Sequence, residues 1–377
     1  MKEIIDVAAL QIASLNELMD SSIKESFEKL MAEFDDLKGV ISPGMKVLIK
    51  PNIVAPFEKA TTSKLLLECM IRLIHSNNAI ALVAESAGFE FSTAETFKIL
   101  GIDKLCAKHN VDLINLDMAE YVSVQSGNLD VKEYRLPKIV FEVDKIINMP
   151  CLKGHSLTKV TLGIKNLFGF LHRETRRKIH ATNLDIGIAA LSKLIKVDFI
   201  VVDGLWKLDN AVYDDKPVLQ GIIIAGRDLL EVDYVCCDIL GICPEEIGHI
   251  GLSVPEGYPV HPKVKYLTAV NAVAPDFKNR SRHFEKQNYK YKMMYLADTW
   301  VYNLFKKSII PFCHYYLGQR PRLNRKKCLK CDKCVKACPV DAINNYSISS
   351  NKCMKIRCFR CYNVCESGAI KKVGFHK

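Results

Sequence analysis

Hydrophobic and polar residues along the first 275 positions form two recurring kinds of segment. Short, continuous apolar runs, which are typical of strands buried on both faces, lie at 46–52, 79–86, 111–117, 144–150, 198–204 and 219–226. Segments with apolar residues at helical spacing lie between them, at 61–76, 94–109, 156–171, 184–195 and 228–240. This alternation predicts an α/β fold over residues 1–275, with a mostly parallel sheet and helices on both of its faces.

The helix predicted at 156–171 has two different faces. Its apolar stripe, which we expect to pack on the sheet, comprises Leu157, Val160, Ile164, Leu167, Phe168 and Leu171. Polar residues occupy other faces, with Thr158, Thr161, Lys165 and His172 on one line and His155, Lys159 and Asn166 beside it. A solvated helix surface is the simplest interpretation of such residues, and a binding site is the alternative.

Polar residues also follow several predicted strands directly, which is where ligands bind in open α/β sheets. They are Lys50, Asn52, Glu85, Ser86, Lys153, His155 and Asp203. Because the carboxyl ends of parallel strands share one edge of the sheet, we expect these side chains to lie near Lys165 and Asn166. Lysine, histidine and asparagine side chains, together with helix N-terminal amides, suit a phosphate, carboxylate or other anion.

These residues lead to a hypothesis about roles. Substrate binding is assigned to Lys50, Asn52, Lys153 and Asn166, and catalysis to His155, Lys165 and Asp203. Histidine can move protons near neutral pH, and a carboxylate such as Asp203 can accept a proton or bind a cation. An ordinary surface or core role is the alternative for each residue. Cys151 fits a small buried residue better than a nucleophile.

Cysteines are concentrated near the end of the chain. Eight of the fifteen fall between Cys328 and Cys365, in the runs C-x2-C-x2-C-x3-C-P, starting at Cys328, and C-x4-C-x2-C-x3-C, starting at Cys353. The last three cysteines of each run have counterparts 27 residues away in the other run, so the unit is duplicated. Such crowding indicates metal or cluster ligation rather than a disulfide framework.

The cysteine module resembles a bacterial two-[4Fe–4S] ferredoxin along its whole length. In that family the last cysteine of each run ligates the cluster held by the other run. The resemblance implies two [4Fe–4S] clusters, one held by Cys328, Cys331, Cys334 and Cys365, and the other by Cys353, Cys358, Cys361 and Cys338. A pair of four-cysteine zinc sites is the alternative. The second run departs from the pattern in its longer first spacing and in Glu366, which stands where the first run has Pro339.

Residues 276–327 differ from the rest of the chain in charge and aromatic content. This stretch holds 13 Lys and Arg against 3 Asp and Glu, whereas residues 1–275 hold 30 against 36 and residues 328–377 hold 10 against 3. It also contains 11 of the 32 Phe, Tyr and Trp residues. We predict a basic, aromatic helical linker at 276–327, between the α/β domain and a ferredoxin-like domain at 328–377. Docking of an acidic redox partner and contact with an anionic membrane surface are alternatives, and no nucleic-acid-binding module is present.

Three stretches of the first domain carry a resemblance to a known family. The stretches are VLIKPNIV (47–54), INMPCLKGHSLTKVTLGIKNLFG (147–169) and IIIAGRDLLEVDYVCCDILG (222–241). Together they resemble the family catalogued as domain of unknown function 362, which often carries a C-terminal two-cluster ferredoxin module. The resemblance implies the fold and domain layout rather than a reaction. Neither a GxGxxG dinucleotide fingerprint nor a GxxxxGK[ST] phosphate loop is present.

These features support three functional hypotheses. The first is an iron–sulfur oxidoreductase whose clusters exchange electrons with an anionic substrate in the α/β domain. The second is a non-catalytic electron-transfer adapter that docks an acidic flavoprotein or reductase through the basic C-terminal region. A cluster-based sensor is the weakest, because no DNA-binding module accompanies the clusters. No run of eighteen apolar residues and no signal peptide are evident, so we expect a cytoplasmic protein.

Overall fold

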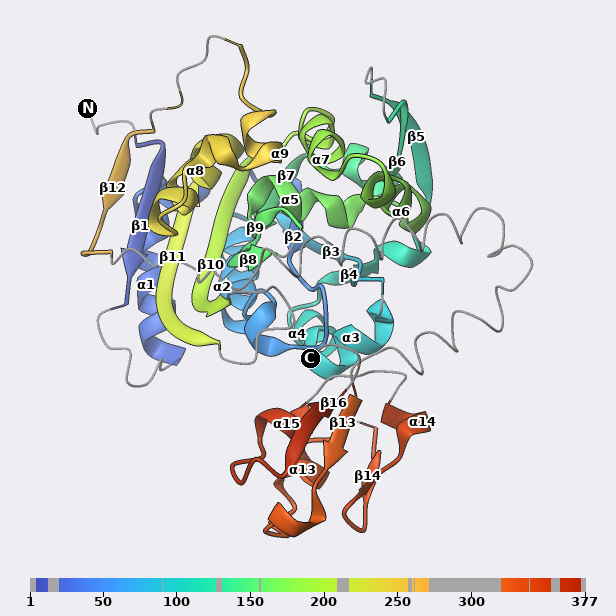
Figure 1. Cartoon of the computed structure of the whole chain (residues 1–377). Coiled ribbons are helices and arrows are strands. Elements are labelled where there is room, and N and C mark those ends of the chain that lie inside the picture. Colours follow the sequence, from blue (N-terminus) through green and yellow to red (C-terminus); the bar gives the residue numbers. More distant parts are fainter. Residues whose placement is uncertain are drawn as a thin grey trace.

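A computed structural model describes residues 5–12, 20–89, 91–126, 131–155, 157–208, 217–256, 260, 262–270, 320–338, 340–353 and 360–373 (Figure 1). Most of the predicted linker, residues 276–319, lies outside these ranges, as do Cys358 and Pro339. The domain boundaries and the helical linker therefore stay predictions.

The central element is a ten-stranded sheet whose main path runs β12-β1-β11-β10-β7-β2-β3-β4. Its strands are β12 (Val264–Tyr266), β1 (Val7–Gln11), β11 (Val218–Gly226), β10 (Phe199–Leu208), β7 (Lys145–Met149), β2 (Lys46–Pro51), β3 (Ile80–Glu85) and β4 (Asp112–Asn115), with β8 (Cys151–His155) and β9 (Lys159–Thr161) attached beside β10. Neighbours from β10 to β4 are parallel, and β11 is antiparallel to both β10 and β1. The predicted α/β fold with a mostly parallel sheet is confirmed.

Helices cover both faces of this sheet (Figure 1). They are α1 (Asp20–Ala32), α2 (Lys64–Ser76), α3 (Thr93–Leu100) and α4 (Ile102–Lys108) on one side, and α5 (Gly163–Asn166), α7 (Leu184–Ser192), α8 (Leu229–Ile239) and α9 (Gly248–Gly251) on the other. Further elements are α6 (Arg173–Ala181), the hairpin of β5 (Tyr121–Gln125) and β6 (Glu133–Pro137), and the 3-10 turns η2 (Glu58–Ala60), η5 (Leu167–Phe170) and η7 (Pro244–Glu246). Both faces are therefore buried, as the continuous apolar strands require.

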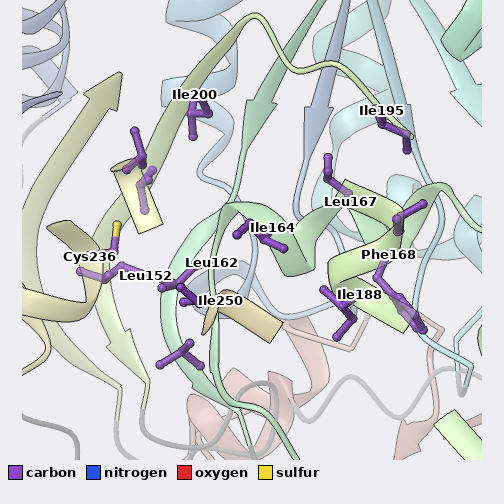
Figure 2. Close-up of a cluster of buried hydrophobic side chains, with 14 of the residues drawn as sticks. Leu152, Leu162, Ile164, Leu167, Phe168, Ile188, Ile195, Ile200, Cys236 and Ile250 are labelled. Atoms are coloured by element: carbon purple, nitrogen blue, oxygen red, sulfur yellow. The ribbon is translucent and has the colours of Figure 1, made fainter. Parts of the chain in front are cut away.

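The two-residue period of β2 decides which side chains reach which layer. Val47 and Ile49 pack with the α1–α4 layer, whereas Leu48 packs with the opposite layer. Figure 2 shows that opposite core, where Leu162, Ile164 and Leu167 lie with Ile188 of α7 and Ile250 of α9. Lys50 follows Leu48 by two residues and so extends from the strand toward the α5 layer.

The prediction of a helix at 156–171 is wrong. The chain instead forms the antiparallel hairpin of β8 and β9, followed by the short α5 and the turn η5. Lys159 takes a left-handed φ of 61°, which interrupts a helix, and β-branched Val160 and Thr161 favour a strand. The predicted apolar stripe is still buried except for Leu157, so apolar residues close to helical spacing mark burial here and not a helix.

The helix predicted at 94–109 is two helices. Gly101, with φ of +69°, ends α3 and precedes α4. Glycine adopts this left-handed conformation more easily than other residues do, so the glycine at this position indicates where the helix ends.

Two backbone amides at the start of α5 are held by a carboxylate from another helix. The Asp233 side chain of α8 is fully buried and accepts hydrogen bonds from Gly163 N (2.7 Å) and Ile164 N (2.9 Å). Gly163 is required for this approach, since a Cβ at that position would lie 2.7 Å from Leu229 Cδ1 and 2.9 Å from Asp233 Oδ1. Because α5 is too short to be stable alone, this cap and its packing fix its place.

The C-terminal module is a small unit of paired strands and short helices. Strand β13 (Arg320–Leu323) pairs antiparallel with β16 (Ile370–Val373), and β14 (Ile343–Asn344) pairs with β15 (Ser347–Ile348). The helices are α13 (Lys333–Lys336), α14 (Ser350–Cys353) and α15 (Arg360–Asn363). Its core contains Ile343 and Ile370 together with Cys334 and Cys361, so cysteines make up much of the interior.

We predict that Asp233→Asn lowers the free energy of unfolding of the α/β domain by about 1–3 kcal/mol, because the amide can offer only one acceptor oxygen to two buried N–H groups. Urea unfolding followed by circular dichroism measures the change. Asp238→Asn, on the exposed side of the same helix, is the control and should stay within about 0.5 kcal/mol of the native chain. Equal effects of the two substitutions would contradict the capping role.

Candidate functional site

The strands β2 and β7 lie at the topological switch point of the sheet, where the strand order reverses. From β2 the chain adds β3 and β4 on one side, and it then returns to place β7 on the other. In open α/β sheets the carboxyl ends at such a switch point are where ligands bind. Lys50 and Asn52 come from the end of β2, and Asn148 comes from β7 beside it.

A buried ion pair lies at this switch point. Lys50 Nζ is 2.6 Å from Glu85 Oε2, and neither side chain is more than 3% exposed. The second carboxylate oxygen accepts from Ser86 N at 2.7 Å, and Ile53 N also donates to Glu85. Burial lowers the pKa of Lys50, and the adjacent Glu85 carboxylate opposes that shift.

Gly169 makes room for this ion pair. A Cβ at Gly169 would lie 2.5 Å from Glu85 Oε1 and 2.7 Å from Lys50 Nζ, distances that no real side chain tolerates. The Gly169 carbonyl also accepts from the Ser86 hydroxyl at 2.6 Å. The turn η5 is thus fixed against the carboxyl ends of β2 and β3 by the polar groups it covers.

An asparagine chain continues from the ion pair. Asn52 Nδ2 donates to Asn166 Oδ1 (2.8 Å), Asn166 Nδ2 donates to Asn148 Oδ1 (2.7 Å), and Asn148 Nδ2 donates to the Gly163 carbonyl (2.9 Å). Lys153 Nζ donates to Asn52 Oδ1 (2.7 Å) and to the Ala60 carbonyl (2.6 Å). The four residues predicted to bind substrate are therefore brought together, and much of their hydrogen-bonding capacity is used among themselves and their neighbours.

Lys165 differs from the other two buried lysines. The residue is 8% exposed, and among the described residues no acceptor lies within hydrogen-bonding distance of its ammonium, which lies 5.4 Å from the centroid of the Phe168 ring. Burial, and then the charge of Lys153, lower the pKa of Lys165 to about 8. A buried cation without an acceptor is costly unless a ligand supplies one.

His155 lies at the end of β8, where its ring closes the turn to β9. Leu157 N and Thr158 N donate to His155 Nδ1 at 3.1 and 3.3 Å. Burial, followed by the charge of Lys165, lowers the pKa of His155 well below its usual range. The imidazole is therefore neutral at physiological pH.

Asp203 lies on β10, where it accepts hydrogen bonds from Ser63 N (2.6 Å) and Leu205 N (3.0 Å). Burial raises the pKa of Asp203 to about 6, although both hydrogen bonds oppose the shift. Burial also raises the pKa of the nearby Cys151 thiol to about 12, which fits the small buried residue expected from the sequence.

Further charged residues at this edge of the sheet form contacts that the sequence did not predict. Arg173 Nε is 2.9 Å from Asp117 Oδ1, and Arg176 Nη1 donates to the Ala87 carbonyl at 3.1 Å. Asp185 at the start of α7 accepts from His249 of α9. Neither Asp185 nor His249 follows a strand or belongs to a motif, so periodicity and spacing gave no signal for them.

In the C-terminal module, a hollow is lined by Cys328, Cys331, Cys334 and Cys365. The first three lie at and before α13, and Cys365 comes from the end of the second cysteine run. No three His, Cys, Asp or Glu side chains in the described parts of the chain converge on a single-ion site. Thiols arranged around a hollow suit a cubane with four iron corners better than one ion. The donor set therefore fits a [4Fe–4S] cluster.

Cysteines predicted to hold the second cluster are only partly described. Cys338 Sγ accepts a hydrogen bond from Ala342 N at 3.2 Å, and Cys361 is buried in the module core beside the partly buried Cys338. Cys353 is partly exposed at the end of α14, and Cys358 lies outside the described residues. The second ligand set stays a prediction.

Comparisons with known proteins find matches to both the α/β domain and the cysteine module. The family model described as domain of unknown function (DUF362) matches residues 47–238, and that of a 4Fe-4S binding domain matches residues 321–344. The thylakoid-associated protein sll1697 of Synechocystis sp. is 23% identical over 236 residues, which span 60% of this chain and 72% of that protein.

Among solved structures, the lactate racemase apoprotein from Thermoanaerobacterium thermosaccharolyticum is similar, with a TM-score of 0.41 and 17% identity. The similarity covers 62% of this chain and 57% of that chain, and it carries no implication for activity. Within the described ranges, no helix is long and apolar enough to cross a membrane.

We predict that Glu85→Gln destabilises the α/β domain by about 3–5 kcal/mol, because it leaves the Lys50 ammonium buried without a counter-charge. Chemical unfolding of both proteins measures the difference. Glu142→Gln removes a carboxylate that pairs with Lys138 at the surface, and it should leave stability close to that of the native chain. A Glu85→Gln chain as stable as this control would show that the buried pair is not needed.

Proposed function

Because the chain belongs to the family defined by domain of unknown function 362 and also carries a 4Fe-4S binding domain, we propose that it is an iron–sulfur redox protein that binds two [4Fe–4S] clusters and exchanges electrons with an anionic substrate held in the α/β domain. The observation that carries the proposal is the hollow lined by Cys328, Cys331, Cys334 and Cys365. Three of these cysteines come from one run and the fourth from the other, which is the exchange expected of a two-cluster module.

In this proposal the first cluster is held by the four cysteines of the hollow, and the second by Cys353, Cys358, Cys361 and Cys338. Bound clusters would supply one-electron transfer over a range of potentials. The duplicated 27-residue spacing supports the second site. The Ala342 N–H that donates to Cys338 Sγ also fits a thiolate that accepts hydrogen bonds.

Lysines and arginines around the module would favour the more negative, reduced clusters. Lys333 at the start of α13 is exposed, and it pairs with Glu366 at 2.6 Å. Arg325, Lys326 and Lys330 are exposed beside Cys328. Their positive charge should raise the reduction potential of the nearest cluster.

The α/β part of the proposal rests on its buried cations. Lys50 is paired with Glu85, and Lys153 is bound by Asn52 and the Ala60 carbonyl, so these residues and Asn166 would form a rigid, positively charged floor. Lys165 would contact the anion directly, because no acceptor among the described residues occupies its ammonium. His155 and Asp203 would complete the site, with pKa values displaced by burial in opposite directions.

A second candidate function is a non-catalytic adapter that passes electrons to or from an acidic flavoprotein or reductase. The observation that favours it is Leu329, which is 73% exposed between Cys328 and Cys331 and has exposed lysines on both sides. An exposed apolar residue with exposed lysines close to it in the sequence suits docking of an acidic protein near a cluster. An adapter would need no ligand at Lys165.

Anaerobic purification with iron, sulfide and zinc analysis tests the proposal. We expect about eight irons and eight labile sulfides per chain. Cys365→Ser should lose about half of both, because it removes a ligand to one of two clusters. Cys243→Ser, at an exposed cysteine outside the module, is the control and should lose none. Zinc without sulfide, or a full iron content in Cys365→Ser, would overturn the cluster assignment.

A further inference from the structure

Two buried polar atoms beside α5 lack any hydrogen-bond partner in the described residues. They are Nε2 of His249, a residue that is 0% exposed, and Oγ1 of Thr161, a residue that is 6% exposed. Strand β9 and helix α9 both contact α5, so these atoms lie on elements that flank Lys165. An unsatisfied buried polar atom costs about 1–3 kcal/mol, so native proteins seldom leave one without a purpose.

The proton on His249 is placed by Asp185. Oδ1 of Asp185 lies 3.2 Å from His249 Nδ1, and the same oxygen accepts from His249 N at 3.1 Å. A carboxylate can only accept, so Nδ1 carries the hydrogen and Nε2 presents a bare lone pair. Gly248 permits this contact, since a Cβ there would lie 2.6 Å from Asp185 Cγ and Oδ2.

His155 has the opposite tautomer. Its Nδ1 accepts from the backbone N–H groups of Leu157 and Thr158, so the ring hydrogen must be on Nε2. No described residue accepts from that Nε2–H, and the side chain is partly exposed. One histidine therefore offers a donor and the other an acceptor.

Lys165 links the two histidines. Its charge lowers the pKa of both His155 and His249, in each case after the larger effect of burial. The charges of His180, Lys153 and His249 further lower the pKa of His155. Helix α5, which carries Lys165, contacts both α9 and β9, the pairing partner of β8, so the three residues lie on adjoining elements. Apolar side chains fix this arrangement, because Ile164, Ile188 and Ile250, from α5, α7 and α9, share one core (Figure 2).

We propose that Lys165, His155 and His249 form a carboxylate-binding, proton-abstracting site, with His249 as the general base and Asp185 as its positioning residue. The ammonium of Lys165 pairs with the carboxylate of a small monoanionic substrate. The Nε2–H of His155 donates a hydrogen bond to a second substrate oxygen, and Nε2 of His249 faces the proton to be removed. This rests on the proposed function, whose anionic substrate it specifies.

The step is a proton transfer and needs no oxidant or reductant. The substrate X–H bond breaks, an N–H bond forms at His249 Nε2, and the electron pair stays on the substrate. The imidazolium that results is stabilised by the Asp185 carboxylate, as in other carboxylate–histidine pairs. His155 stays neutral throughout, since its Nδ1 is already occupied by two N–H donors.

A monocarboxylate fits the site better than a phosphate. Lys165 is the one buried lysine in the described chain whose ammonium lacks an acceptor, because Lys50 binds Glu85 and Lys153 binds Asn52. Arg176, the buried arginine at this edge, binds the Ala87 carbonyl and lies near Asp117. Among the described lysine and histidine side chains at this site, only the Lys165 ammonium and the His155 Nε2–H present unused donors, which suits the two oxygens of a carboxylate, whereas the further oxygens of a phosphate would find no such donors.

Calorimetric titration of the anaerobically purified, oxidised holoprotein with acetate, and separately with inorganic phosphate, tests the proposal. Repeating it in buffers of different ionisation enthalpy gives the number of protons taken up on binding. At about pH 6.5 Lys165, with a pKa of about 8, is already protonated. The titratable groups around His249 are Asp185 of α7, Lys165 of α5, His155 of β8, and Glu245 and Glu246 of η7, whose side chains bind Cys243 and Lys159. Burial raises the pKa of Asp203 to about 6 and that of Asp233 to about 7, so both also titrate near this pH. The part of the uptake that His249→Gln removes therefore reports the bare Nε2.

We expect saturable acetate binding with proton uptake. Lys165→Met should weaken binding about tenfold or more, and Lys178→Met, at an exposed lysine, should not. His249→Gln and Asp185→Asn should reduce the proton uptake, whereas His155→Gln should weaken binding and keep the uptake. His75→Gln, at an exposed histidine, is the matched control. Circular dichroism of each variant establishes that it folds.

The outcomes separate this inference from the proposed function. Acetate binding at Lys165 with unchanged uptake in His249→Gln overturns the general base and leaves the anion site standing. Phosphate binding without acetate binding overturns the carboxylate class alone. Binding of neither anion overturns the inference and also the α/β substrate site, which leaves the adapter function, while the iron and sulfide content of the same preparation tests the clusters independently.

Discussion

The buried ion pair between Lys50 and Glu85 is the constraint on which the α/β site depends. Two charges taken out of water are tolerated only when their geometry is good and their remaining donors and acceptors are filled. Glu85 meets this requirement through Ser86 N and Ile53 N, and Gly169 admits the pair because it lacks a Cβ. The turn after α5 is therefore tied to the carboxyl ends of β2 and β3.

From that pair, a polar layer extends across the switch point of the sheet. Asn52, Asn166 and Asn148 join β2, α5 and β7 through side-chain amides, and Lys153 adds a second buried ammonium. A network whose members satisfy one another is rigid, and it specifies one arrangement of the strands and α5. Lys165 lies beside this layer without an acceptor among the described residues, so the layer sets up a positive potential that it does not itself neutralise.

Much of the fold could be predicted from the sequence, because strands buried on both faces leave continuous apolar runs. Because the carboxyl ends of parallel strands share one edge of the sheet, it could also be predicted that Lys50, Asn52, Lys153 and Asn166 lie together. The hairpin at 151–161 could not be predicted in this way, since its apolar residues fall close to helical spacing while Lys159 and the His155-capped turn favour a strand pair. His249 and Asp185 were missed because long-range packing of α7 on α9, and not a local pattern, brings them together.

The central claim is that one ammonium is held inside the α/β domain ready for an anion. The most direct test is the pKa of Lys165, measured by NMR on protein with labelled lysine side chains and assigned with Lys165→Met. The account predicts titration at about 8, moving upward when acetate is added, since a bound anion favours the charged form. Titration near the ordinary lysine value of about 10.4, unaffected by acetate, would contradict it.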